Sequence, residues 1–290
     1  ASSQISSRCG CAPATCIPTL PPCEPATQEM CKSIALSGGS ISLDSGPDRP
    51  LVRPPRGIKS LSGFTLVSSF GISTNGTTTT GGDIGLYPGT YMVGSFVYMN
   101  SSQLHMGDAS SVNASASISV VYHDLVSRSS AHSTSLPGIT LNNEVLFGGL
   151  YISYANMLTV SGSISFDAEG DSSSVFIIKV VGALHVSPYT SMKLLNGAMA
   201  SKVFWVVTSA GHIGRHSSFK GTLLTNSSLS TGNMVDVEGR LFSLNNVTLS
   251  NALVSLPPLV VSSTTEISPR CGCAPATCHL TLPPCEPATE

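Results

Sequence analysis

From residue 61 onward the chain is a succession of short runs in which apolar and polar residues alternate. Typical runs read YMVGSFVYM, MLTVSGSISFD and MVDVEGRLFSL. A period of two puts successive side chains on opposite faces of a strand, and the runs are rich in Val, Ile, Phe, Tyr and Thr, which favour strands. Gly, Asn, Asp and Ser separate the runs, as they do in turns. The pattern predicts a mainly β chain built as a solenoid, sandwich or barrel.

One segment interrupts this pattern. Residues 108–130 read DASSVNASASISVVYHDLVSRSS, and their apolar spacing is compatible with either a strand or a helix. Asp108 is a suitable helix N-cap, and Arg128 carries the charge that favours a helix C-terminus. We therefore expect one long helix over about 108–128.

Composition excludes several classes of function. Charged residues make up 10% of the chain and the net charge is −2, whereas an ordinary domain has roughly 25% charged residues. Nothing here provides the basic surface that nucleic acid or an anionic membrane requires. No nucleophile elbow, zinc-peptidase motif or phosphate-binding loop occurs. We expect no enzyme activity and no cofactor.

Three groups of residues have the types found in binding sites, but each has a simpler structural explanation. His212 and His216 are four residues apart in a Gly-rich stretch without an acidic neighbour, so we expect no metal there. The acidic cluster of residues 167–171 is better explained by turn hydrogen bonds than by calcium. Trp205, inside KVFWVV, is expected in the core rather than at a ligand site.

The two ends of the chain repeat each other. Residues 1–28 and 263–290 agree at 20 of 28 positions. Dense cysteine in a short Pro-rich stretch predicts disulfide-stapled, extended tails in an oxidising compartment. The spacing leaves the pairing of the disulfides open. The cysteines, all in these end segments, are Cys9, Cys11, Cys16, Cys23, Cys31, Cys271, Cys273, Cys278 and Cys285.

These observations divide the chain into four parts. Residues 1–31 form the first tail, and residues 32–60 contain a strand pattern and a Pro/Arg-rich link. Residues 61–256 form the β domain with its helix. Residues 257–290 form a second link and the repeated tail, offset by 262 from the first.

Five Asn-X-Ser/Thr motifs support a secreted or cell-surface glycoprotein. No signal peptide is visible, so a secreted protein is expected in mature form, and no apolar run approaches the ~20 residues of a membrane span. The candidate glycosylation sites are Asn75, Asn100, Asn113, Asn226 and Asn246.

Several segments resemble the ice-binding-protein family of the discontinuous-solenoid type. They include GDIGLYPGT, DAEGDSSSVFI, NGAMASKVFW and FKGTLL, in matching order over about 190 residues. The resemblance implies a right-handed, three-faced β-solenoid with one long helix packed alongside. It also implies a flat face of small Thr, Ser, Ala and Gly that binds ice. The residues compatible with such a face are Thr159, Ser161, Thr225 and Thr231, whereas Tyr189, Arg215 and His216 are bulky for it.

Two functions follow from these features. The first hypothesis is structural: the chain is the repeating unit of an extracellular filament or surface fibre, joined head to tail to copies of itself through its matching tails. The alternative is an ice-binding module whose tails are spacers, or an adhesin that binds a surface or carbohydrate. The near-identical tails favour the first hypothesis, because an isolated ice-binding module does not need them.

Overall fold

The computed structural model describes residues 52–129, 133–136 and 138–258. The predicted tails, all nine cysteines and the strand pattern near residue 40 lie outside these residues. None of the helices in the described part of the chain combines the length and hydropathy needed to cross a membrane.

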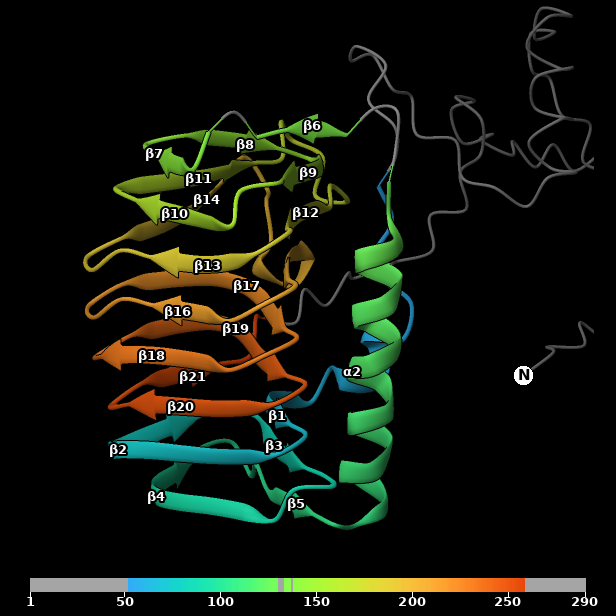
Figure 1. Cartoon of the computed structure of the whole chain (residues 1–290), viewed down its shortest axis with the longest axis vertical. Coiled ribbons are helices and arrows are strands. Elements are labelled where there is room, and N and C mark those ends of the chain that lie inside the picture. The colour runs from blue at the N-terminus through green and yellow to red at the C-terminus, as the bar shows by residue number, and fades with distance from the viewer. Residues whose placement is uncertain (1–51, 130–132, 137, 259–290) are drawn as a thin grey trace, which may run out of the picture. The chain divides into compact units, whose positions relative to one another are not determined.

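Every strand pair found among the described residues is parallel, and the pairings fall into three rows (Figure 1). Row A contains β6 (Thr134–Ser135), β9 (Gly149–Ser153), β12 (Phe176–Val180), β15 (Val203–Val207), the ends of β17 (Ser218–Thr225) and β19 (Asp236–Ser243), β1 (Phe64–Ser68), β3 (Asp83–Leu86) and β5 (Leu104–Met106). Row B contains β7 (Thr140–Asn142), β10 (Met157–Ser161), β13 (Ala183–Val186), β16 (Gly211–Ile213), β18 (Leu229–Asn233), β20 (Asn246–Ser250) and the starts of β2 (Gly71–Thr80) and β4 (Tyr91–Tyr98). Row C contains β8 (Val145–Phe147), β11 (Ser163–Asp167), β14 (Ser191–Leu195), the starts of β17 and β19, β21 (Leu253–Ser255) and the ends of β2 and β4.

The chain does not wind from one end of this stack to the other. Strands β1 to β5 form the coils at one end, and helix α2 (Ala109–Ser127) then runs along the stack to the opposite end (Figure 1). From β6 the chain winds back, until β19 pairs with β1 and both β20 and β21 pair with β2. The first and last coils of the described chain are therefore neighbours.

The alternating runs place one set of apolar side chains inside the coils. Leu158 and Val160 of β10 and Val186 of β13 are fully buried there. Trp205 is also fully buried, with its ring in edge contact with Phe166, and its prediction as a core residue is confirmed. Burying a Leu, Val, Ile or Phe side chain contributes roughly 1.5–3 kcal/mol. Repeated coil after coil, this burial stabilises the stack.

Helix α2 covers the outer side of row A. Its buried residues include Ala114, Ile118, Val121 and Leu125, whose spacing of three and four residues puts them on one helix face. They pack in one cluster with row A side chains that point away from the coil interior. These row A residues are Val67, Ile177, Phe204, Val206, Leu224 and Phe242. Row A is thus buried on both sides, and the prediction of a mainly β chain with one helix over about 108–128 is confirmed.

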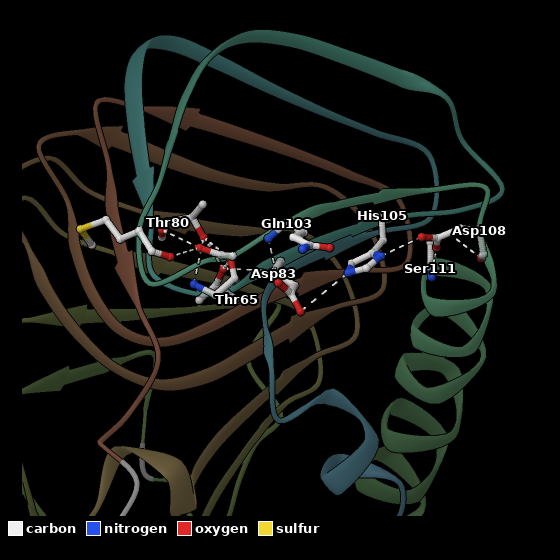
Figure 2. Close-up of polar contacts among 10 residues, drawn as sticks. Thr65, Thr80, Asp83, Gln103, His105, Asp108 and Ser111 are labelled. Carbon is white, nitrogen blue, oxygen red and sulfur yellow. Dashed lines mark hydrogen bonds and ion pairs between the residues drawn. The ribbon is translucent and has the colours of Figure 1, made fainter.

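Polar contacts hold the start of the helix against β3 and β5 (Figure 2). As predicted, Asp108 is the N-cap: its Oδ1 accepts from the Ser111 backbone N–H at 2.8 Å. Its Oδ2 lies 2.7 Å from His105 Nδ1, and His105 Nε2 lies 3.8 Å from Asp83 Oδ2. The hydrogen bond from the Ser111 N–H and then the contact with His105 lower the pKa of Asp108 to about 2.

Two cationic side chains hold the end of the helix. The Lys179 ammonium group, from row A, donates to the carbonyl groups of Val126 and Arg128, where the helix dipole favours a positive charge. Arg128 Nη2 lies 2.6 Å from Asp124 Oδ2 and also donates to the Pro54 carbonyl at 3.2 Å. The Pro/Arg-rich link is therefore fastened to the helix through its backbone.

The corner between rows B and C carries a column of residues in left-handed backbone conformation. Tyr189, His216 and Met234 have φ angles of 62°, 55° and 56°, values that are uncommon for bulky residues. The Tyr189 and His216 rings stack at 5.2 Å, and the Arg215 guanidinium lies 5.7 Å from the Tyr189 ring centre. These bulky side chains belong to the corner and not to the strands of row B.

Candidate functional site

With row A covered by the helix, rows B and C remain as candidate surfaces. Row C carries charge, including Asp167, Lys193, Asp236 and the ion pair of Lys220 with Glu238 at 2.7 Å. The strand segments of row B contain no Asp, Glu, Lys or Arg. Row B is therefore the described surface best suited to an uncharged ligand.

A column of outward side chains runs in register down the middle of row B. Strand pairing aligns Thr159 with Thr140 on one side and with His185 on the other, and the alignment continues across the row. In order, the column is Thr140, Thr159, His185, His212, Ser230, Thr248, Ser73 and Val93. Neighbouring strands are ~4.8 Å apart, so adjacent Thr and Ser members present hydroxyl groups at this interval on either side of the two histidines.

A second set of small polar residues flanks this column. Ser161 aligns with Asn142, and Asn75 aligns with Ser250. Within the column, Ser73 Oγ donates to Thr248 Oγ1 at 3.2 Å. The hydroxyl groups of row B therefore stand on a rigid backbone whose own N–H and C=O groups are used in the strand pairing.

The four predicted surface residues separate into two pairs. Thr159 and Ser161 are partly exposed on row B. The expectation for Thr225 and Thr231 is wrong, because both are buried. Thr225 ends β17 in row A and donates to the Ser227 carbonyl at 2.8 Å. Thr231 points inward from β18 and accepts from the Ser250 N–H at 3.2 Å.

Four members of the column were not predicted from the sequence, namely Thr140, Ser230, Thr248 and Ser73. A local signal for some of them existed, namely a polar residue between two inward apolar residues, as in Leu158-Thr159-Val160 and Val247-Thr248-Leu249. That signal identifies an outward residue. It does not give the row to which the residue belongs, because the row depends on where the strand lies within its coil.

Two histidines occupy the centre of the column. The rings of His185 and His212 stack with centroids 5.4 Å apart and planes 13° from parallel. His212 Nδ1 lies 2.9 Å from Ser230 Oγ. Burial, and then the neighbouring His185, lower the pKa of His212, so its imidazole is neutral at neutral pH. His212 and His216 are four residues apart in the sequence but do not come together. His216 lies at the corner, where its ring stacks on Tyr189.

The acidic cluster of residues 167–171 forms turn hydrogen bonds, as predicted. Asp167 Oδ1 accepts from the Glu169 N–H and Asp171 Oδ1 from the Ser173 N–H, each at 2.8 Å. Hydrogen bonds from Ser173 lower the pKa of Asp171. No group of three or more His, Cys, Asp or Glu residues suited to a metal ion is found within the described part of the chain.

The candidate glycosylation sites fall on different surfaces. Asn113 is exposed on the helix, and Asn100 and Asn226 are exposed in connecting segments. Asn75 and Asn246 lie on row B strands. A glycan on either of the last two residues would stand on or beside the hydroxyl column.

Comparison with known proteins identifies the fold. The family model described as ice-binding-like matches residues 66–255. An ice-binding protein of a Colwellia species is 25% identical over 210 residues, covering 67% of this chain and 81% of that protein. Ice-binding protein 1 of Shewanella frigidimarina is 32% identical over 109 residues, which cover 37% of this chain but only 12% of that protein.

Solved structures agree with this result. A crystal structure of an ice-binding protein from an Antarctic biological consortium superposes with a TM-score of 0.66 at 30% identity, covering 76% of this chain and 97% of that one. The ice-binding domain of the Shewanella frigidimarina protein superposes with a TM-score of 0.64 at 24% identity, covering 73% of this chain and all of that one.

These matches overturn the first functional hypothesis. The relatives and structural neighbours are named for ice binding and not as filament subunits, so the hypothesis of a head-to-tail structural repeat is wrong. That hypothesis rested on the repeated tails, whose similarity says nothing of what the β domain between them binds. The match over residues 66–255, which spans more than half of the sequence, shows that this chain belongs to the ice-binding-like family.

Proposed function

We propose that this chain binds ice through row B. The observation that carries the proposal is the in-register column of outward Thr and Ser residues on the one uncovered row whose strands hold no Asp, Glu, Lys or Arg. The names of the relatives support the same activity.

The physical argument rests on regular spacing and rigidity. Hydroxyl groups repeated at ~4.8 Å can hydrogen-bond a regular layer of water. Each such contact is weak on its own, because it replaces a hydrogen bond to bulk water. Many contacts made together by a preformed surface add up, since little conformational entropy is lost on binding. A fixed charge would instead orient the nearby water molecules around itself. The strands of row B carry no such charge unless a histidine is protonated.

The same proposal covers the solenoid geometry, the location of the protein, its glycans and its tails. We take the three rows as the three faces of a right-handed solenoid, with row B as its ligand-binding face. We further propose a secreted or cell-surface location, N-linked glycans at some of the five motifs, and disulfide-stapled tails that act as spacers.

A matched pair of substitutions tests the proposal. Thr159 on β10 and Ser165 on β11 are outward positions on consecutive strands of the chain, one on row B and one on row C, and both are partly exposed. Thr159→Tyr should remove most of the thermal hysteresis and the inhibition of ice recrystallisation, because the ring stands above the hydroxyl column. Ser165→Tyr should leave both activities near those of the unmodified chain.

Other results would contradict the proposal. Absence of both activities in the unmodified chain at micromolar concentration would exclude ice binding itself. Equal losses in the two variants, or a loss only in Ser165→Tyr, would exclude row B as the face. Matching circular dichroism spectra and melting temperatures would show that both variants are folded.

A further inference from the structure

We propose that His185 and His212 form a two-imidazole binding site for a divalent transition-metal ion such as Zn²⁺, Ni²⁺ or Cu²⁺. Imidazole suits these ions, whereas Mg²⁺ and Ca²⁺ prefer oxygen ligands. The proposal concerns direct metal binding and does not depend on the proposed ice binding.

The backbone places the two rings on neighbouring strands. His185 of β13 and His212 of β16 are register partners in a parallel pair, and their ring centroids are 5.4 Å apart. Metal–nitrogen bonds are ~2.0–2.1 Å long, so one ion can join two nitrogens up to ~4 Å apart. Metal binding therefore requires the stacked rings to turn about their side-chain bonds until a nitrogen of each comes within that range.

A neighbouring hydroxyl group orients one of the rings. His212 Nδ1 lies 2.9 Å from Ser230 Oγ, the next member of the column. When Nδ1–H donates to this oxygen, Nε2 carries the lone pair that a metal requires. Such an outer partner favours the tautomer that leaves Nε2 free for the metal. The lowered pKa of His212 adds to this, because protons then compete less with the metal near neutral pH.

Among the described residues, those that align with the pair on the adjacent strands carry no positive charge. The register neighbours of the pair are Thr159 and Ser230, which are uncharged. The nearest basic residue along the chain, Arg215, has its guanidinium 5.7 Å from the Tyr189 ring centre at the corner. Among the described residues no carboxylate joins the pair, so water completes the coordination. We therefore expect weaker binding than at a structural site with three or four protein ligands.

Ni²⁺ titration of the full chain tests the site. The thiols are first blocked with N-ethylmaleimide, because cysteines outside the described residues would also bind the ion. His185→Asn and His212→Asn should each lose one bound equivalent or bind it at least about tenfold more weakly, since even outer-partner changes at metal sites cost 10–100-fold. His123→Asn, on the exposed side of the helix, is the control and should match the unmodified chain.

A spectroscopic readout identifies the metal ligands directly. Bound Cu²⁺ in the unmodified chain should show electron paramagnetic resonance coupling to nitrogens of two imidazoles, and His185→Asn should reduce this to one. Unchanged Ni²⁺ binding in both variants would overturn the proposal, as would an effect in only one of them. Melting curves that match the unmodified chain would show that the variants are folded.

Discussion

Ser73 Oγ donates a hydrogen bond to Thr248 Oγ1 at 3.2 Å, although the two residues are 175 positions apart in the sequence. Ser73 lies on β2, in the first coils of the described chain, and Thr248 lies on β20, in the last. Their strands pair directly. Row B is thus one continuous surface made from both ends of the β domain, and Ser73 joins its hydroxyl column only when those ends dock.

Helix packing should contribute strongly to stability. Ile118 is fully buried between the helix and row A, whereas Val120, two residues later, is 52% exposed. Ile118→Ala should lower the free energy of unfolding by about 2–5 kcal/mol, the usual cost of removing a buried aliphatic side chain. Val120→Ala should change it by less than about 0.7 kcal/mol, since only helix propensity is altered. Denaturant unfolding measures both, and equal effects would contradict the packing described for α2.

Because of the helix N-cap, the stability of the folded chain should depend on pH in the acidic range. The pKa of Asp108 falls from 3.8 to about 2 in the folded chain. The stabilisation from this carboxylate is therefore fully present above pH 3.8 and is lost as the pH falls through about 2. The melting temperature of Asp108→Asn should fall less between pH 4 and pH 2 than that of the unmodified chain, because Asn caps a helix without titrating. Parallel melting curves over this range would contradict the assignment.

Protonation of row B should weaken the proposed ice binding. The pKa of His212 is lowered below its ordinary value of 6.5, chiefly by burial, so the folded chain takes up a proton at this site less readily than the unfolded chain. Stability from this group is present above pH 6.5 and declines as the pH falls below it. Thermal hysteresis should decline in the same direction, because the added charge lies in the middle of the hydroxyl column.

The matching control for the pH effect is the double variant His185→Asn and His212→Asn. It should show little pH dependence of thermal hysteresis between pH 8 and pH 5. An equally steep decline in the double variant would assign the pH effect to groups outside row B.

Glycosylation should affect activity according to its position. Asn246 lies on row B two residues before Thr248, on the same side of β20, whereas Asn113 lies on the helix. In a host that attaches N-glycans, an occupied Asn246 should lower thermal hysteresis by covering the column, and Asn246→Gln should restore it. Asn113→Gln should have no effect. Glycopeptide mass spectrometry establishes occupancy, and full activity with Asn246 occupied would contradict row B as the binding face.

The sequence alone determined the local features of this protein. Period-two alternation predicted the strands, because each strand buries one side against the coil interior. Asp108 predicted the start of the helix, since an N-cap satisfies backbone groups only a few residues away. Trp205 was predicted in the core from its apolar neighbours alone. Each of these inferences depends on interactions within a short segment.

Only the tertiary structure decided which polar residues share a surface. Thr159 and Thr225 both lie on strands, yet Thr159 points outward on row B, whereas Thr225 aligns with the inward Val207 and is buried on the inner side of row A. Likewise, His212 pairs with His185 of the preceding coil and not with His216. Coils of unequal length and turns at the corners set this register. The reason is physical: local alternation specifies inward or outward, while alignment across coils depends on contacts between residues far apart in the sequence.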